Sequence, residues 1–176
     1  MKPFALKYGQ GVAAALALLA LTACSQAAPK TDTIFLVRHA EKTTEKTDPG
    51  LTEAGKARAE ALADRLEGED ITHIFSSDYI RTRDTAAPLA QRLGLEIEIY
   101  DAGDLPGITE TLKATPGRLL VVGHSNTTPQ LTELLGGDGG TPIIEATEYD
   151  RLYVVTMGEG DPVKSYLTQY GAASAK

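Results

Sequence analysis

Two histidines and two arginines of this chain stand close to the places where short apolar segments end. Arg38 and His39 come directly after the run IFLV, and His124 follows the run LLVVG. Arg81 comes shortly after a third, shorter segment, HIFS. A neutral imidazole is a competent nucleophile near neutral pH, and a guanidinium can donate paired hydrogen bonds to phosphoryl oxygens. Together, these four side chains have the chemistry for transferring a phosphoryl group without a metal.

Apolar runs alternate with segments of helical periodicity, and this alternation predicts an α/β fold. Strands are expected at 34–37, 73–76, 95–100, 119–122, 151–157 and 163–168. Helices are expected at 51–66, 82–93, 105–114 and 128–135, and a loop at 138–148. Pro88 should kink the second helix or mark its true start. Because ligands of open α/β sheets bind outside the carboxyl ends of the strands, the four candidate side chains should meet at one edge.

Three short motifs carry a resemblance to a known family. The segments RHA (38–40), SSDYIRTRDTA (76–86) and GHSN (123–126) resemble the ordered motifs of the histidine phosphatase superfamily, which includes phosphoglycerate mutase. The resemblance extends from Ile34 to Met157. It implies a three-layer α/β/α sandwich with a mostly parallel central sheet.

The same resemblance implies a mechanism and a role for each residue. His39 would attack phosphorus and form a phosphohistidine intermediate, while Arg38, Arg81 and His124 would hold the phosphoryl group. No cofactor and no metal are expected, because the three histidines lie far apart in the sequence. Ala40 stands where glycine is frequent in the family. The short segment between the arginine helix and the second histidine resembles the small phosphatase branch more than the mutases.

The acid that would protonate the leaving group is less well defined. In many family members it comes from the segment that is YDAGDLPGITE here. Asp104 and Asp101 are therefore the candidates, with Glu110 a weaker third. An equally good interpretation makes Asp104 the N-cap of the helix that follows it.

Two other functions are compatible with parts of the sequence. The run VVGHSNT resembles the nucleophile elbow of a serine hydrolase with Ser125 as nucleophile, but threonine occupies the position of the last glycine and no histidine follows His124. A non-catalytic phosphate-binding lipoprotein on the same fold is the other alternative. Retention of all four central side chains favours the phosphatase over both.

The N-terminal 23 residues are typical of a secretory signal, with two lysines followed by an apolar stretch. The tetrapeptide LTAC resembles the lipobox of bacterial lipoproteins, which makes Cys24, the sole cysteine, the expected lipidation site. An ordinary cleaved signal is the alternative. The predicted organisation is a signal peptide (1–23), a tether (24–33), the phosphatase domain (34–170) and a C-terminal tail (171–176).

This organisation predicts a lipid-anchored protein in the bacterial cell envelope, facing the periplasm. Ser25 after the cysteine favours the outer membrane where a cell has one. Loss of the signal would leave 15 basic and 24 acidic side chains, a formal charge of −9 that disfavours nucleic acid as a partner. The expected substrate is a small phosphorylated molecule or a phosphoprotein. The sequence does not define which one, nor the oligomeric state.

Overall fold

The computed structural model describes Met1, residues 31–158 and residues 160–174 of the chain. The predicted signal segment, the lipidation site Cys24 and residues 24–30 of the tether lie outside the described residues. Within the described part, every helix is too short or too polar to cross a bilayer.

Six strands form one mixed sheet in the order β3-β2-β4-β1-β5-β6. The first four strands in this order are mutually parallel, whereas β5 and β6 form an antiparallel hairpin that pairs with β1. This confirms the predicted α/β class and the hairpin at the sheet edge. The strands are β1 (Thr31–Arg38), β2 (His73–Ser77), β3 (Ile97–Tyr100), β4 (Arg118–Gly123), β5 (Arg151–Gly158) and β6 (Lys164–Gln169).

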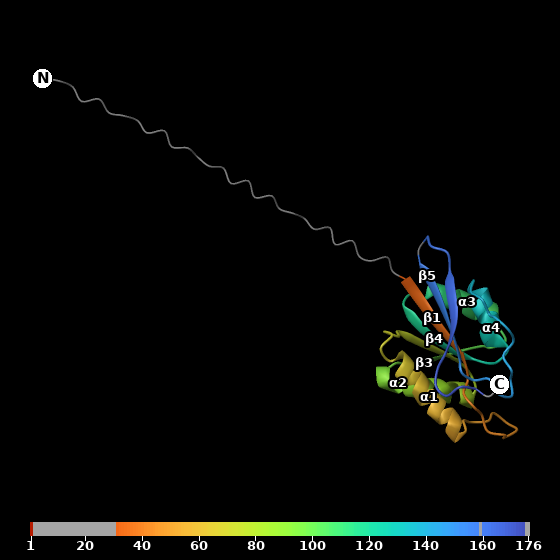
Figure 1. Ribbon diagram of the computed structural model, residues 1–176. Coiled ribbons are helices and arrows are strands. Elements are labelled where there is room, and N and C mark those ends of the chain that lie inside the picture. Colours follow the sequence, from red (N-terminus) through yellow and green to blue (C-terminus); the bar gives the residue numbers. More distant parts are fainter. Residues whose placement is uncertain (2–30, 159, 175–176) are drawn as a thin grey trace.

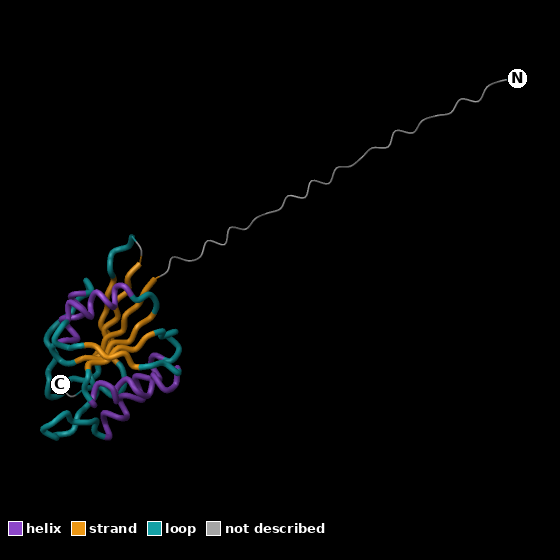
Figure 2. Tube along the Cα trace, turned by 180° about the vertical axis from the view of Figure 1, so that it is seen from behind, coloured by secondary structure: helices purple, strands orange, loops and turns teal. Residues whose placement is uncertain are grey.

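Four helices cover the two faces of the sheet and complete the three layers (Figures 1 and 2). One pair, α1 and α2, packs on one face, and the other pair, α3 and α4, packs on the opposite face. The helices are α1 (Glu53–Leu66), α2 (Ile80–Leu93), α3 (Leu105–Ala114) and α4 (Thr127–Leu134).

Strand β1 shows how the sequence builds both cores at once. Successive side chains of a strand point to opposite faces. Phe35 and Val37 therefore pack with α1 and α2, while Ile34 and Leu36 pack with α3 and α4. All four are at most 1% exposed, so the apolar run IFLV reflects a central strand that is covered on both sides.

Some boundaries differ from the sequence prediction. Strand β1 begins at Thr31, so residues 31–33 of the predicted tether pair with β4 and β5. Helix α2 begins at Ile80 and continues through Pro88, which therefore does not mark its start. The missing N–H of Pro88 falls opposite the carbonyl of Asp84, an exposed residue where water can replace it.

Strand β3 is shorter than the predicted strand at 95–100, and its last two side chains differ in burial. Ile99 is 51% exposed, whereas Tyr100 is buried and its hydroxyl donates to the Val122 carbonyl. The physical reason is that β3 is an edge strand, so Ile99 at the end of the sheet is left without a layer above it.

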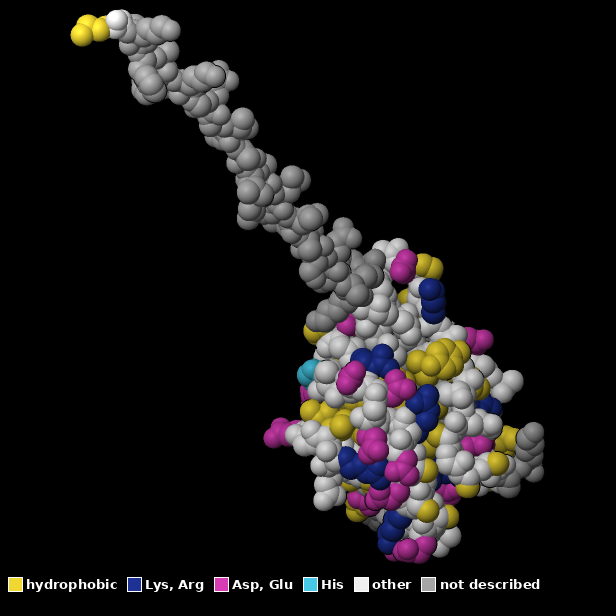
Figure 3. Space-filling model, turned by 60° about the vertical axis from the view of Figure 1, so that its left-hand side comes forward, with side chains coloured by type: hydrophobic (Ala, Val, Ile, Leu, Met, Phe, Trp, Pro, Cys, Tyr) yellow, Lys and Arg dark blue, Asp and Glu magenta, His cyan; other side chains and the backbone are white. Residues whose placement is uncertain are grey.

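The face of the molecule shown in Figure 3 carries acidic and basic side chains interspersed with one another. Arg92 of α2 pairs with three carboxylates of α1 and its C-cap, those of Glu60, Asp64 and Glu67. On that face the basic side chains do not form a continuous patch.

Candidate active site

A pocket of about 290 Å³ opens at the carboxyl ends of the central strands. It contains the two histidines that follow β1 and β4 and the arginine of the first turn of α2, as the rule for open α/β sheets predicts. The lining residues are His39, Lys42, Tyr79, Arg81, His124, Ser125, Asn126 and Glu145.

The imidazole of His39 is fixed in one tautomer by its own backbone. Nδ1 lies 2.8 Å from the carbonyl oxygen of Ala40, which can only accept, so Nδ1 carries the proton. The lone pair is therefore on Nε2. The ring is only 3% exposed, and the Ala40 amide is itself held by Thr85 Oγ1 at 2.9 Å. This arrangement presents a neutral, oriented nucleophile.

His124 lies beside His39, with 5.5 Å between the ring centroids and 67° between the ring planes. Its Nε2 is 2.9 Å from Ser77 Oγ, and its Nδ1 is 3.5 Å from Arg81 Nη2. Because a guanidinium can only donate, Nδ1 accepts and Nε2–H donates to Ser77. The strand end must be glycine here, since a Cβ on Gly123 would lie 2.9 Å from Tyr100 Oη.

Arg81 is held between an aromatic ring and a carboxylate. Its Cζ lies 4.3 Å from the centroid of the Tyr79 ring, and Nη1 lies 3.6 Å from Asp48 Oδ1. Asp48 also accepts the Ile80 amide at the start of α2. The Arg81 Nε is buried without a hydrogen-bond partner among the described residues, so one donor remains for a ligand.

Arg38 is buried next to this pocket but is not one of its lining residues. Its Nη1 donates to the Glu148 carbonyl at 2.9 Å and its Nη2 to the Glu145 carbonyl at 2.7 Å. The guanidinium also stacks on the Tyr149 ring at 4.1 Å. The loop before β5 thus occupies two of its five donors. The fold brings Arg38 close to the site, but of the four candidate residues only the other three line the pocket.

Burial is the main cause of unusual pKa values in the pocket. It lowers the pKa of His39 from 6.5 to about 3, against its hydrogen bond to Ala40, and the charges of Arg38 and Arg81 contribute in the same direction. Burial and the same two arginines lower the pKa of His124 to about 4. Both rings are therefore neutral over the physiological pH range. The positive charges of Arg38 and Arg81 lower both pKa values, although only Arg81 lines the pocket.

The carboxylates that the sequence offers as the acid, Asp104 and Asp101, do not line this pocket. Asp104 caps α3 by accepting the Gly107 amide at 2.9 Å, and Asp101 accepts the Gly103 amide at 2.8 Å. Both line a separate pocket beside β3 and α3. Glu110 is on the outer surface of α3, near Lys113. The N-cap interpretation of Asp104 is thus the correct one, because the helix end needs an acceptor there.

Four residues of the pocket wall were missed from the sequence: Lys42, Tyr79, Asn126 and Glu145. Tyr79 and Asn126 lie inside the motifs SSDYIRTRDTA and GHSN, so these motifs could have identified them as candidate site residues. Glu145 comes from the loop before β5, whose path could not be predicted. Ser125 also lines the pocket, but the hydrogen bonds of His124 go to Ser77 and Arg81, so no triad geometry supports a serine nucleophile.

The described residues contain no cluster of three or more His, Cys, Asp or Glu side chains placed to bind a metal ion. The cationic groups of the site are its arginines and Lys42.

Comparison with known proteins agrees with this geometry. Residues 34–102 match the sequence profile of the histidine phosphatase superfamily (branch 1). A probable phosphoglycerate mutase GpmB from Photorhabdus laumondii is 41% identical over 71 residues, which are 36% of this chain and 33% of that protein. A GpmB from Yersinia enterocolitica is 37% identical over the same length. The chain thus matches about a third of the length of these relatives.

Solved structures extend the likeness to most of the chain. The protein histidine phosphatase SixA, complexed with tungstate, superposes with a TM-score of 0.65 at 19% identity, covering 78% of this chain and 96% of SixA. A mycobacterial glucosyl-3-phosphoglycerate phosphatase gives 0.62 at 16% identity, covering 82% of this chain and all of that one. These neighbours show the fold. The profile match to the histidine phosphatase superfamily covers residues 34–102, which include the RHA and SSDYIRTRDTA motifs.

Proposed function

We propose that this protein hydrolyses phosphomonoesters through a phosphohistidine intermediate on His39. The observation that carries the proposal is the hydrogen bond from His39 Nδ1 to the Ala40 carbonyl, which leaves the Nε2 lone pair available in a pocket shared with His124 and Arg81. With a pKa lowered to about 3, the ring is a free base at any ordinary pH.

The reaction takes two displacements at phosphorus. In the first, the Nε2 lone pair of His39 forms an N–P bond while the P–O bond to the leaving group breaks, and the leaving oxygen takes up a proton. In the second, water forms a new P–O bond, the N–P bond breaks, and the water gives up a proton. Inorganic phosphate and the neutral imidazole result, so the enzyme is regenerated.

Charge on the equatorial oxygens is balanced by positioned cationic donors. Arg81 and His124 line the pocket, and the buried Nε atoms of Arg81 and Arg38 have no hydrogen-bond partner among the described residues. The two arginines supply positive charge and N–H donors for a tetrahedral anion, so we expect turnover to be independent of added metal. That SixA was solved with tungstate, a tetrahedral oxyanion, is consistent with such a site on this fold.

Glu145 is our candidate for the acid that protonates the leaving group. It is the one carboxylate among the pocket-lining residues, and its backbone is fixed by the bond from Arg38 Nη2 to its carbonyl. Such an acid contributes a factor of roughly 10² to 10⁴ in rate. Glu145→Gln should therefore slow alkyl phosphates much more than p-nitrophenyl phosphate, whose leaving group needs no proton. Equal effects on both substrates would remove Glu145 from this role.

The substrate class that fits best is a small phosphomonoester or an exposed phosphorylated side chain. The pocket of about 290 Å³ is larger than a phosphoryl group, so it also has room for part of the group that carries the phosphate. The relatives include sugar-acid phosphatases and a protein histidine phosphatase. A screen of phosphomonoesters and phosphopeptides for phosphate release would identify the preferred class.

The decisive experiment is to trap the intermediate. Rapid acid-free quenching of the protein with a ³²P-labelled substrate should give an acid-labile, base-stable phosphoprotein, and His39→Ala should give none. An active His39→Ala variant would refute the mechanism. If the wild-type protein binds phosphate without turnover, and the folded variant is also inactive, the result would instead indicate the non-catalytic phosphate-binding alternative.

We also propose that the protein is a lipoprotein anchored through Cys24 in the cell envelope. The proposal rests on the LTAC tetrapeptide behind an apolar N-terminal stretch. Metabolic labelling with a fatty-acid analogue should mark the wild-type chain and not Cys24→Ala. Absence of label from both chains, with release of both into the soluble periplasmic fraction, would leave only an ordinary cleaved signal.

A further inference from the structure

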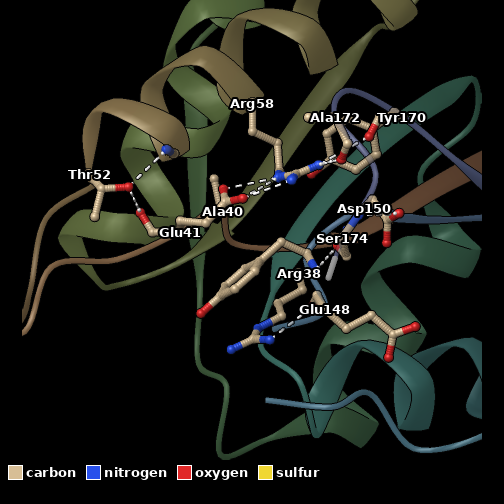
Figure 4. Close-up of polar contacts among 12 residues, drawn as sticks. Arg38, Ala40, Glu41, Thr52, Arg58, Glu148, Asp150, Tyr170, Ala172 and Ser174 are labelled. Carbon is tan, nitrogen blue, oxygen red and sulfur yellow. Dashed lines mark hydrogen bonds and ion pairs between the residues drawn. The ribbon is translucent and has the colours of Figure 1, made fainter. Parts of the chain in front are cut away.

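We propose that the C-terminal segment 170–174 is a positioning element of the phosphate site, which holds the backbone around His39 and the guanidinium of Arg38 in place. The sequence alone marks residues 171–176 only as a tail. In the structure the described part of this segment makes polar contacts to both sides of the site (Figure 4).

The first contact runs through Arg58 of α1. Its Nη1 donates to the carbonyls of Tyr170 and Ala172 at 3.2 and 2.9 Å. Its Nε and Nη2 bind the Glu41 carboxylate at 2.7 to 3.0 Å. Arg58 is only 5% exposed, so this bidentate pair is well ordered and weakly screened.

Glu41 follows the residue whose carbonyl fixes the His39 tautomer, which is Ala40. The turn at Glu41 is tightly packed against α1, because a Cβ on Gly55 at the start of that helix would overlap the Glu41 carbonyl oxygen. The Thr52 amide also donates to that oxygen at 2.9 Å. A shift of Glu41 would therefore move the acceptor that orients the nucleophile.

The second contact runs through Ser174. Its Oγ accepts the amides of Tyr149 and Asp150 at 2.8 and 3.1 Å, and its own amide donates to Asp150 Oδ2 at 3.0 Å. Tyr149 is the residue whose ring stacks on Arg38. The neighbouring Glu148 carbonyl accepts from Arg38. The hydroxyl of Ser174 thus fixes the backbone on which the guanidinium lies.

Both contacts come from five consecutive residues, so the segment connects the nucleophile side and the arginine side of the site. It touches neither substrate nor the reacting atoms, and its role is one of positioning. The inference rests on the proposed role of Arg38 in phosphate binding. The position of Arg38, however, can be measured without any turnover.

The test compares Ser174→Ala with Ser165→Ala. The control loses a similar bond, from the Asp138 amide to Ser165 Oγ at 2.9 Å, but in a loop beside β6. Ser174→Ala should lower kcat/KM and weaken inhibition by vanadate roughly tenfold, the effect of leaving two amides unpaired, while Ser165→Ala stays within about twofold of wild type. Ser174→Thr, which keeps the hydroxyl, should restore both values.

A second measurement follows Arg38 directly. Hydrogen-bonded guanidinium protons exchange slowly and give resolved ¹⁵N–¹H signals, which Arg38→Lys assigns. These signals should persist in wild type and Ser165→Ala and be lost in Ser174→Ala. If Ser174→Ala does not fold, Ser174→Cys, which keeps the backbone and replaces the hydroxyl by a weaker acceptor, is used in its place.

The two proposals fail in different ways. A wild-type protein without turnover would refute the proposed phosphatase, yet loss of the Arg38 signals in Ser174→Ala would still support positioning by the tail. Ser174→Ala with the kinetics and Arg38 signals of Ser165→Ala would overturn the positioning role, whatever the activity of the wild type.

Discussion

Two pockets lie close to the ends of the parallel strands, and they differ in what their polar atoms already do. The pocket with His39 and Arg81 measures about 290 Å³, and the one with Asp101 and Asp104 about 390 Å³. In the larger pocket Asp101 and Asp104 each accept a nearby backbone amide. In the smaller one a histidine lone pair and an arginine Nε–H remain available.

The difference shows that the type of residue in a pocket is a weak guide to chemistry. A carboxylate that caps a helix is bound to backbone groups that would otherwise be unsatisfied, so removing it costs folding energy. An imidazole whose second nitrogen is fixed by the backbone is set up to react. The following four predictions test this contrast between a chemical pocket and a structural one.

The largest effect is expected in the smaller pocket on removal of the nucleophile. His39→Ala should reduce kcat by at least about a thousandfold, because the N–P bond can no longer form. Added imidazole should restore part of the activity by entering the vacated space. Steady-state assays with p-nitrophenyl phosphate would measure both. If His39→Ala kept activity within tenfold of wild type, the two pockets would no longer differ, because neither would hold a nucleophile.

The second largest effect is expected at the partner ring. His124→Asn should lower kcat/KM by about 10², since it removes one positioned group from the developing charge while leaving the nucleophile intact. Vanadate inhibition should weaken in parallel. A loss of affinity without any change in kcat would mean that His124 only binds the substrate.

Acid should affect the smaller pocket through protonation of its histidines. Their pKa values are lowered to about 3 and 4 in the folded protein, against about 6.5 when unfolded, so the unfolded chain binds protons first. Stability due to these groups is complete above pH 6.5 and is lost as the pH falls toward 4, by up to about 1.4 kcal/mol per pH unit for each ring.

Urea unfolding at a series of pH values would measure this slope. His39→Gln should flatten it by about one proton, and bound phosphate, which favours the protonated rings, should protect the wild type at low pH. The activity of the wild type should show no loss near pH 6.5 from the nucleophile. An imidazole signal that titrates near pH 6.5 in the NMR spectrum of the wild type, and is absent from His39→Gln, would show that the ring is not desolvated.

The smallest catalytic effect is expected in the larger pocket. Asp104→Ala should change kcat by less than about twofold, yet destabilise the fold by about 1 kcal/mol through loss of the α3 cap. Asp104→Asn, which can still accept the Gly107 amide, should keep the stability. If both variants lost most activity at unchanged stability, the larger pocket would take part in catalysis and would not be a purely structural one.

The sequence was sufficient to locate the candidate site because the ends of the central strands can be recognised in it. The runs IFLV and LLVVG are apolar enough to be central strands, so the positions of His39 and His124 at one edge followed from α/β topology. The orientation of Arg38 did not follow, since it depends on carbonyls of Glu145 and Glu148 more than 100 residues away.

The acid that protonates the leaving group could not be identified from the sequence for a related reason. Asp104 carries the same side chain whether it caps a helix or protonates a leaving group, and only the path of the chain distinguishes the two roles. Glu145, the one carboxylate in the pocket wall, lies in a loop whose path is set by distant contacts. Local sequence carries little information about such contacts.

The direction of β1 determines how the protein would meet its substrates. Thr31 is at one end of this strand and Arg38 at the other, a distance of roughly 25 Å for eight extended residues. If the chain is tethered to a lipid bilayer upstream of Thr31, the pocket lies at the end of β1 that is remote from the attachment. A pocket at that end leaves room for phosphorylated macromolecules as well as for small phosphomonoesters.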